Sequence, residues 1–235
     1  MEYVPFCGPP PVPSEIWSRW TLDPWLLGGL AIALLAGIAL ARDRHRFVLG
    51  WGLVALAFTS PLCAASMALF SARIAQHLVL TLIAAPVLAA ALPRLRLPPV
   101  VTAAGFAVLF WFWHLPGPYE ATLRSDAAYW AMHVSVLGGA VLLWCSLLNA
   151  ARELPFAGML ALALTAAQMT GLAVALTFSA RVWHPWHMAT APTWGLDAMQ
   201  DQALSGAIMW VGGGALFVLM TAILATRLVR AEAAR

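Results

Sequence analysis

The chain has 235 residues, of which 62% are hydrophobic and only 10% are charged. Soluble globular domains carry about 45–50% apolar and about 25% charged residues, so this composition argues against a soluble enzyme. It also excludes a disordered chain, because disorder requires low hydrophobicity. The net charge is +3, from 13 arginines, no lysine and ten acidic residues, and it does not point to nucleic acid. We therefore predict an all-α integral membrane protein.

Residues 1–23 carry five prolines and no apolar core. They predict an extended, proline-rich extracytoplasmic tail rather than a cleavable signal peptide. A membrane-spanning helix needs about 20 mainly apolar residues, and seven stretches meet this requirement. They are residues 24–41, 47–66, 74–92, 99–115, 127–148, 156–179 and 199–226. We predict a seven-transmembrane-helix bundle over residues 24–228 and a short cytoplasmic tail over residues 229–235.

The arginines predict the orientation, because cytoplasmic loops carry an excess of basic residues. With the first loop in the cytoplasm, nine arginines fall on that side and four on the other. The N-terminus is then outside and the C-terminus is cytoplasmic. This pattern fits a multi-pass protein of the bacterial inner membrane.

The three cysteines are widely separated in the sequence and form no CxxC motif. A disulfide scaffold is therefore not expected. Cys7 with Cys63 is the one pair we consider, because Cys145 lies within an apolar stretch.

Ionisable side chains converge at the predicted outer side of the bundle. His77 lies about one turn into the third span, His114 ends the fourth, and His133 lies about two turns into the fifth. Asp201 opens the seventh span at the same level. Ionisable groups inside a span normally face the bundle interior with a partner. Imidazole with carboxylate is a ligand set for zinc, copper or iron, so these four residues are the candidate metal ligands.

Weaker candidates surround this set. Met67 and Met132 would supply thioether sulfur, which favours Cu(I). His184 and His187 lie in the last outer loop among tryptophans, where they also fit a wet aromatic loop. The alternative for each residue is structural: an intramembrane histidine often joins helices by hydrogen bonds, methionine fills gaps, and an acidic residue favours a helix N-terminus.

Three short motifs occur in chain order on the predicted spans. They are Gln76-His77-Leu78-Val79-Leu80 with Ala84-Ala85-Pro86, Trp111-Phe112-Trp113-His114-Leu115-Pro116 with Tyr119 and His133, and Asp201-Gln202 with Gly206 and Met209-Trp210. Together they resemble the polytopic CtaG family, membrane proteins associated with cytochrome c oxidase assembly. The resemblance covers roughly residues 70–212.

This resemblance implies a non-enzymatic assembly factor for a haem–copper oxidase that delivers copper, expected as Cu(I). It implies that His77, His114, His133 and Asp201 are the functional positions. Partners would be the lipid bilayer, oxidase subunits and periplasmic copper chaperones. One position departs from the family pattern: Arg73 stands where many members carry a further histidine, and a guanidinium cannot ligate a metal.

Three other functions stay open at this point. A b-type haem-binding membrane oxidoreductase could use His77 and His133 as axial ligands, although His114 and Asp201 would then have no role. A metal-free assembly scaffold would use the polar cluster only to lock the helices together. A transporter is less supported, because the inner halves of the predicted spans carry no charged residue.

Overall fold

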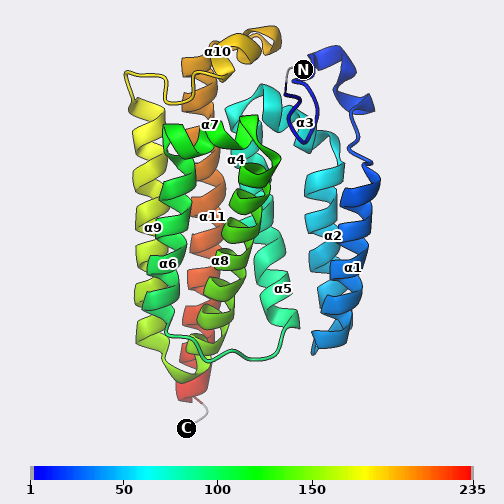
Figure 1. The fold of residues 1–235 in the computed structure, drawn as a ribbon. Coiled ribbons are helices and arrows are strands. Elements are labelled where there is room, and N and C mark those ends of the chain that lie inside the picture. Colours follow the sequence, from blue (N-terminus) through cyan, green and yellow to red (C-terminus); the bar gives the residue numbers. More distant parts are fainter. Residues whose placement is uncertain (1–2, 234–235) are drawn as a thin grey trace.

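The computed structural model describes residues 3–233 and contains helices without any strand in that range. Long helices run side by side, and the first and last described segments lie at opposite ends of the bundle (Figure 1). The order of the longer elements is α1 (Pro24–Leu40), α2 (Arg44–Thr59), α3 (Pro61–Ala68), α4 (Phe70–Leu78), α5 (Ala85–Ala91), α6 (Pro99–His114), α7 (Pro116–Arg124), α8 (Asp126–Glu153), α9 (Pro155–Phe178) and α11 (Ala198–Ala233).

Each of the seven predicted apolar stretches coincides with helix in the structure. By length and composition, four helices within the described residues could cross a membrane, or six if each of two bent pairs is one span. α1 is apolar but has only 17 residues. Seven crossings and the direction of the termini therefore stay predictions. Residues 229–233 are helical and continue α11, and residues 234–235 lie outside the described range.

Proline breaks the helix within the second predicted span and ends the helix of the fourth. α2 and α3 meet at an angle of 48° where Pro61 follows Ser60, and α6 and α7 meet at 68° where Pro116 follows Leu115. Proline disfavours helical backbone in the residue before it. Ser60 and Leu115 are accordingly extended. Proline then starts the next helix, where its missing N–H costs nothing.

The third predicted span contains a π-helical turn, η2 (Val79–Ala84), between α4 and α5. Pro86 explains this irregularity, because a proline ring clashes with the carbonyl of the residue four positions earlier and a wider turn relieves the clash. The Thr81 carbonyl accepts a hydrogen bond from the Trp144 indole at 2.8 Å. Such turns are frequent at functional sites, and His77 lies two residues before the first residue of this one.

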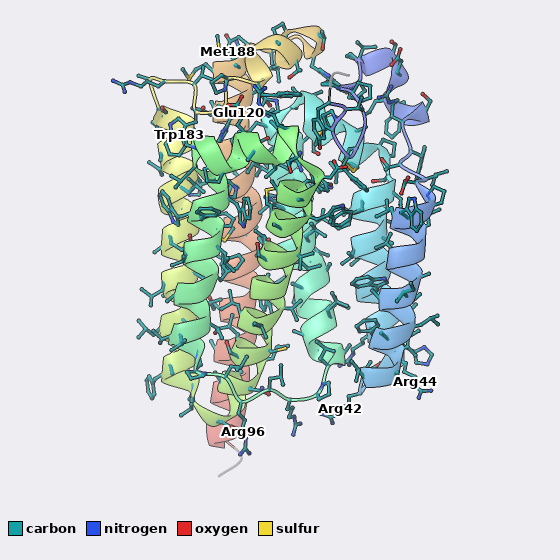
Figure 2. The ribbon with its side chains drawn as sticks, in the orientation of Figure 1. Arg42, Arg44, Arg96, Glu120, Trp183 and Met188 are labelled. Carbon is teal, nitrogen blue, oxygen red and sulfur yellow. A yellow bond between two sulfur atoms is a disulfide. The ribbon has the colours of Figure 1, made fainter. Side chains whose placement is uncertain are left out.

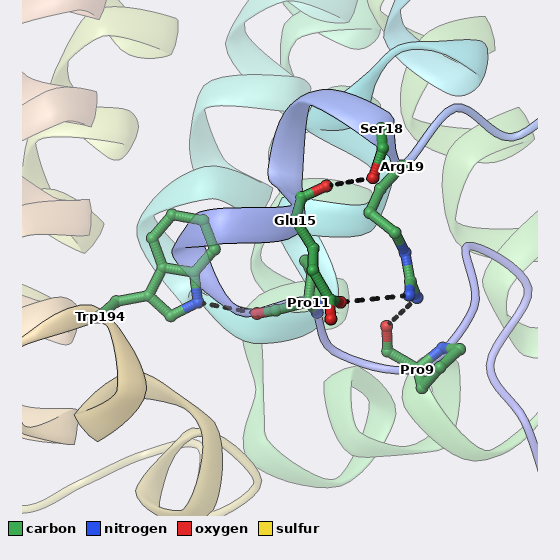
Figure 3. A network of polar contacts seen from close by, with 6 residues as sticks. All are labelled: Pro9, Pro11, Glu15, Ser18, Arg19 and Trp194. Atoms are coloured by element: carbon green, nitrogen blue, oxygen red, sulfur yellow. Dashed lines mark hydrogen bonds and ion pairs between the residues drawn. The ribbon is translucent and has the colours of Figure 1, made fainter.

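The N-terminal tail folds over the end of the bundle that is predicted to be outside, and it is not simply extended. It forms a 3₁₀ helix, η1 (Pro13–Ser18). Arg19 donates to the Pro9 carbonyl at 2.7 Å, and Trp194 donates to the Pro11 carbonyl at 3.0 Å (Figure 3). Trp194 ends a second 3₁₀ helix, η3 (Ala191–Trp194), which follows α10 (His187–Thr190). The first and last outer segments are thereby joined.

A disulfide joins Cys7 of the tail to Cys63 of α3, which confirms the one pair considered from the sequence. The Tyr129 hydroxyl of α8 lies 3.2 Å from the Cys7 sulfur. Phe6 stacks on the Tyr129 ring with the two ring centres 5.2 Å apart. These contacts hold the tail against the part of α8 that precedes His133. Cys145 is the free cysteine, and it is buried.

α11 packs against α9 and α4, and α6 packs against α8 and α9. Gly206 is the point of close approach between α11 and α9. A Cβ atom there would lie 2.6 Å from the Ala173 carbonyl oxygen and would also collide with Thr177. Small residues permit such close packing between membrane helices.

Candidate metal centre

Three buried imidazoles from three helices lie together in the half of the bundle that the N-terminal tail covers. The ring centre of His77 in α4 is 5.7 Å from that of His114 in α6 and 5.3 Å from that of His133 in α8. Each of the three residues is at most 2% exposed. His77 therefore lies between the other two. The structure brings these three predicted site residues into one cluster, called the imidazole cluster below.

Backbone carbonyl groups determine which ring nitrogen carries the hydrogen in two of these histidines. The Nδ1 atom of His114 lies 2.6 Å from the Phe110 carbonyl oxygen, and that of His133 lies 2.9 Å from the Tyr129 carbonyl oxygen. A carbonyl only accepts, so each Nδ1 carries the hydrogen. In a neutral imidazole the Nε2 atom then has a free lone pair. Neither Nε2 atom has a hydrogen-bond partner in the structure.

His77 is the central ring, and neither of its nitrogens has a hydrogen-bond partner. Buried polar atoms are nearly always paired, so four unpaired imidazole nitrogens in one cluster need an explanation. With metal–nitrogen bonds of about 2.1 Å, two imidazoles that share one tetrahedral ion have ring centres about 5.4 Å apart. The two observed separations are close to this value.

The two separations are compatible with a shared ion, and they also fall in the ordinary range for edge-to-face pairs of rings. Within the described residues, however, no group of three or more His, Cys, Asp or Glu side chains is arranged to hold one metal ion. The structure therefore brings three donor side chains near one another without arranging them as the ligands of one ion. Neutral imidazole suits copper as well as zinc and iron.

Asp201 is not directed at these rings. Its carboxylate accepts hydrogen bonds from the backbone N–H groups of Phe70 at 2.6 Å and Ser71 at 3.1 Å, and it also accepts one from the Ser71 hydroxyl. These groups open α4, whose own N-cap residue Leu69 has no side chain able to cap. Asp201 of α11 thus caps another helix, and a negative charge at that position is favourable.

The two loop histidines differ from each other. His187 is satisfied: its Nδ1 donates to the Ala68 carbonyl at 3.1 Å, and its Nε2 accepts from the Tyr119 hydroxyl at 2.8 Å. Both nitrogens of His184 lack a partner, and its ring lies against Phe70 and Tyr119. Of the two, His184 has the chemistry of a further donor.

Burial controls the protonation of both loop histidines. Loss of hydration lowers the pKa of His184 to about 2, and the neighbouring His114 and His187 lower it further. Loss of hydration also lowers the pKa of His187 to about 4, against a smaller opposing effect of its bond to Ala68. Both rings are therefore neutral at pH 7, which is the form that can bind a metal.

The two predicted methionines are fully buried, and one of them faces a cation. The Met67 sulfur lies 3.8 Å from a guanidinium nitrogen of Arg73. Met132 lies beside His133 in the sequence of α8, and no described contact joins its sulfur to the imidazole cluster. Arg73 itself is fully buried, and its guanidinium lies 5.2 Å from the centre of the Tyr129 ring.

Arg73 lies one helical turn before His77 in α4. Its Nε and Nη1 atoms have no hydrogen-bond partner, and its charge acts on both His77 and His133. Buried charges are rare unless they are paired. A positive charge at this place weakens the binding of any metal cation in the imidazole cluster.

Sequence reasoning missed the structural importance of Tyr129. Its carbonyl fixes the His133 ring, its hydroxyl contacts the disulfide, and its ring faces Arg73. Its position four residues before His133 was an available signal, because residues i and i+4 share one helix face. Gln202, which lies next to Asp201, holds the last outer loop by accepting from the Trp183 backbone N–H at 2.7 Å.

A family model described as "Cytochrome c oxidase caa3 assembly factor (Caa3_CtaG)" matches residues 36–98 and 94–231. The chain belongs to this family. The match covers the imidazole cluster, Arg73 and Asp201, and it confirms the resemblance found in the three motifs. None of the curated proteins or solved structures compared with the chain matches it. The Caa3_CtaG family is thus a family of oxidase assembly factors, and the chemistry within it has to be argued from the residues.

Proposed function

We propose that this protein supports maturation of a haem–copper oxidase by holding copper, as cargo in the Cu(I) state, in the imidazole cluster. The observation that carries this proposal is the set of unpaired nitrogens on three adjacent rings: both nitrogens of His77 and the Nε2 atoms of His114 and His133. Copper would be held by two nitrogens at a time, which leaves the ion open to ligand exchange.

Because His77 lies between the other two rings, the copper ion could pass from one pair of histidines to the other. His77 would share the ion with His133 in one arrangement and with His114 in the other, so exchange at a single ligand would move the ion toward the end of α6. His114 ends α6 at the outer end of the bundle, where His184 in the adjoining loop presents two further unpaired nitrogens. Transfer to an oxidase subunit, and loading by a periplasmic copper chaperone, would then occur at this face of the bacterial inner membrane.

The experiment is a Cu(I) titration of purified protein against a chromophoric chelator, with ascorbate as the reductant. A Cys145→Ser background removes the buried free thiol as a competing ligand. We expect about one equivalent of Cu(I) in this background and its loss in His77→Ala. His45→Ala is the matched control, because His45 is exposed at the start of α2, at the opposite end of the bundle. Equal copper content in all three proteins would overturn the copper proposal.

Two other functions predict different results. A b-type haem protein, which would use His77 and His133 as axial ligands, would show an intense Soret band in the purified protein. A metal-free scaffold would tolerate His77→Gln and His133→Gln in an oxidase maturation assay, because glutamine keeps hydrogen bonding but is a poor ligand. The copper proposal requires that His77→Gln fail, because His77 takes part in both arrangements of the ion.

A further inference from the structure

A second polar site lies at the end of the bundle opposite to the imidazole cluster. A cavity of about 640 Å³ opens between the α1–α2 corner, the end of α5 and the last third of α8. Four arginines line it, together with a single aspartate: Arg42, Arg44, Arg46, Arg94 and Asp43. We call this cavity the arginine pocket. Arg42 and Arg44 lie at the lower end of the molecule in Figure 2, far from Trp183 and Met188.

The charge of the arginine pocket is largely uncompensated. Asp43 is already engaged, because its carboxylate pairs with Arg46 at 3.3 Å and accepts from the backbone N–H of the same residue. Within the described part of the chain, no carboxylate pairs with Arg42, Arg44 or Arg94. Guanidinium groups form bidentate hydrogen bonds with phosphate, so three such groups around one cavity favour a phosphate ligand.

The pocket is built into the fold rather than formed by mobile loops alone. The backbone N–H groups of Arg42 and Asp43 both donate to the Ala91 carbonyl, at 2.8 and 3.1 Å, which ties the corner to α5. The Asn149 side chain donates to the Leu95 carbonyl at 2.6 Å, which ties the segment after α5 to α8. These bonds fix the positions of the backbone that carries the arginines.

The inner wall of the arginine pocket is apolar. Ala89, Ala90, Cys145 and Leu148 line it on the side of the helices. A soluble anion needs no such wall, whereas a lipid places its glycerol and the first carbons of its chains there. The arginine-rich end is also the end predicted to face the cytoplasm, where anionic lipids attract basic residues.

We propose that the arginine pocket binds the phosphate headgroup of an anionic phospholipid. The arginines surround the phosphodiester, and the acyl chains leave along the apolar wall toward the bilayer. Bound there, the lipid bridges α2, α5 and α8 and holds the α1–α2 hairpin against the rest of the bundle. This site is independent of copper binding.

The test is native mass spectrometry of the purified full-length protein in a nonionic detergent, titrated with dioctanoyl phosphatidylglycerol, dioctanoyl phosphatidylcholine or inorganic phosphate. We expect one phosphatidylglycerol per chain and at least tenfold weaker binding of phosphatidylcholine. Arg42→Gln/Arg94→Gln should weaken phosphatidylglycerol binding about 25-fold, at roughly fivefold per arginine. Arg181→Gln, which alters an exposed arginine at the other end, should leave it unchanged.

Three results would overturn the proposal. They are equal binding of the two lipids, unchanged binding in the double variant, and displacement of phosphatidylglycerol by an equal concentration of inorganic phosphate. The last result assigns the pocket to a soluble phosphate. If the double variant does not fold, the headgroup selectivity of the wild-type chain still decides the question.

Discussion

Asp201 caps the helix that carries His77. The carboxylate from α11 accepts both backbone N–H groups at Phe70 and Ser71, two turns before the central ring of the imidazole cluster. The position of that ring in the bundle therefore depends on a residue that does not touch it. This relationship gives Asp201 a structural role that can be separated from metal ligation by experiment.

Replacing Asp201 by Ala should destabilise the protein by about 1–3 kcal/mol, because buried N–H groups of α4 lose their acceptor. Asp201→Asn should cost less, since one acceptor oxygen remains. The measurement is thermal unfolding in detergent, with Asp197→Asn as the control at an exposed cap. A variant at Asp201 that unfolds like wild type but has lost its copper would show instead that Asp201 is a ligand.

Arg73→Gln should raise the affinity for Cu(I). A buried guanidinium one turn from His77 repels any cation in the cluster, and its removal should strengthen binding roughly tenfold or more at an effective dielectric constant of about 20. The chelator titration described above measures the change. Arg124→Gln is a suitable comparison, because Arg124 is exposed and already paired with Glu120. Unchanged or weaker binding in Arg73→Gln would mean that Arg73 helps to hold the cargo.

Acidification should destabilise the outer face of the protein. Burial lowers the pKa of His187 from 6.5 to about 4, so the unfolded chain takes up a proton near pH 6.5 that the folded protein takes up only near pH 4. Stability is therefore complete above pH 6.5 and falls as the pH drops through this window. The loss from His187 alone is roughly 2 kcal/mol at pH 5.

The measurement is the thermal unfolding midpoint between pH 7.5 and pH 4.5. His187→Gln should make the unfolding midpoint fall less steeply as the pH is lowered, because glutamine does not titrate. His45→Gln should leave the dependence of the midpoint on pH as it is in wild type. A pH profile of His187→Gln that superimposes on the wild-type profile would contradict the assignment.

Reduction of the Cys7–Cys63 disulfide should destabilise the protein by about 2–4 kcal/mol, since the bond closes a long loop. It should also release residues 3–12 from Tyr129 and Trp130, which Phe6 contacts. Thermal unfolding and limited proteolysis of the tail, with and without a phosphine reductant, check both effects. Cys7→Ser/Cys63→Ser should match the reduced protein and show no response to the reductant. A reductant effect that persists in this variant would point to another target.

The helices could be anticipated from the lengths of the apolar stretches. The imidazole cluster could be anticipated from the distance of each histidine from the end of its predicted span. Counting turns from the outer end puts His77, His114 and His133 at similar levels, and the ring separations agree with that count. The proline positions also indicate where helices break, although the sequence reasoning did not place a bend within residues 47–66.

The capping of α4 by Asp201 could not be predicted from the sequence in the same way. It depends on α4 beginning at Phe70, and neither a proline nor a glycine marks the extended residue Leu69 that separates α3 from α4. It also depends on α11 packing against α4, which is a contact between segments about 130 residues apart. The distinction between His184 and His187 is equally non-local, because Ala68 and Tyr119 decide it from other helices.

His114 is the last residue of α6, directly before the 68° bend into α7. The ring is fixed to the α6 backbone through Phe110, whereas Tyr119 of α7 is fixed to the loop through His187. Any tilt of α7 therefore changes the distance between the loop that contains His187 and the ring of His114. Under the proposed function, a partner protein that docks on α7 would act on the imidazole at the end of α6 through this bend and this loop.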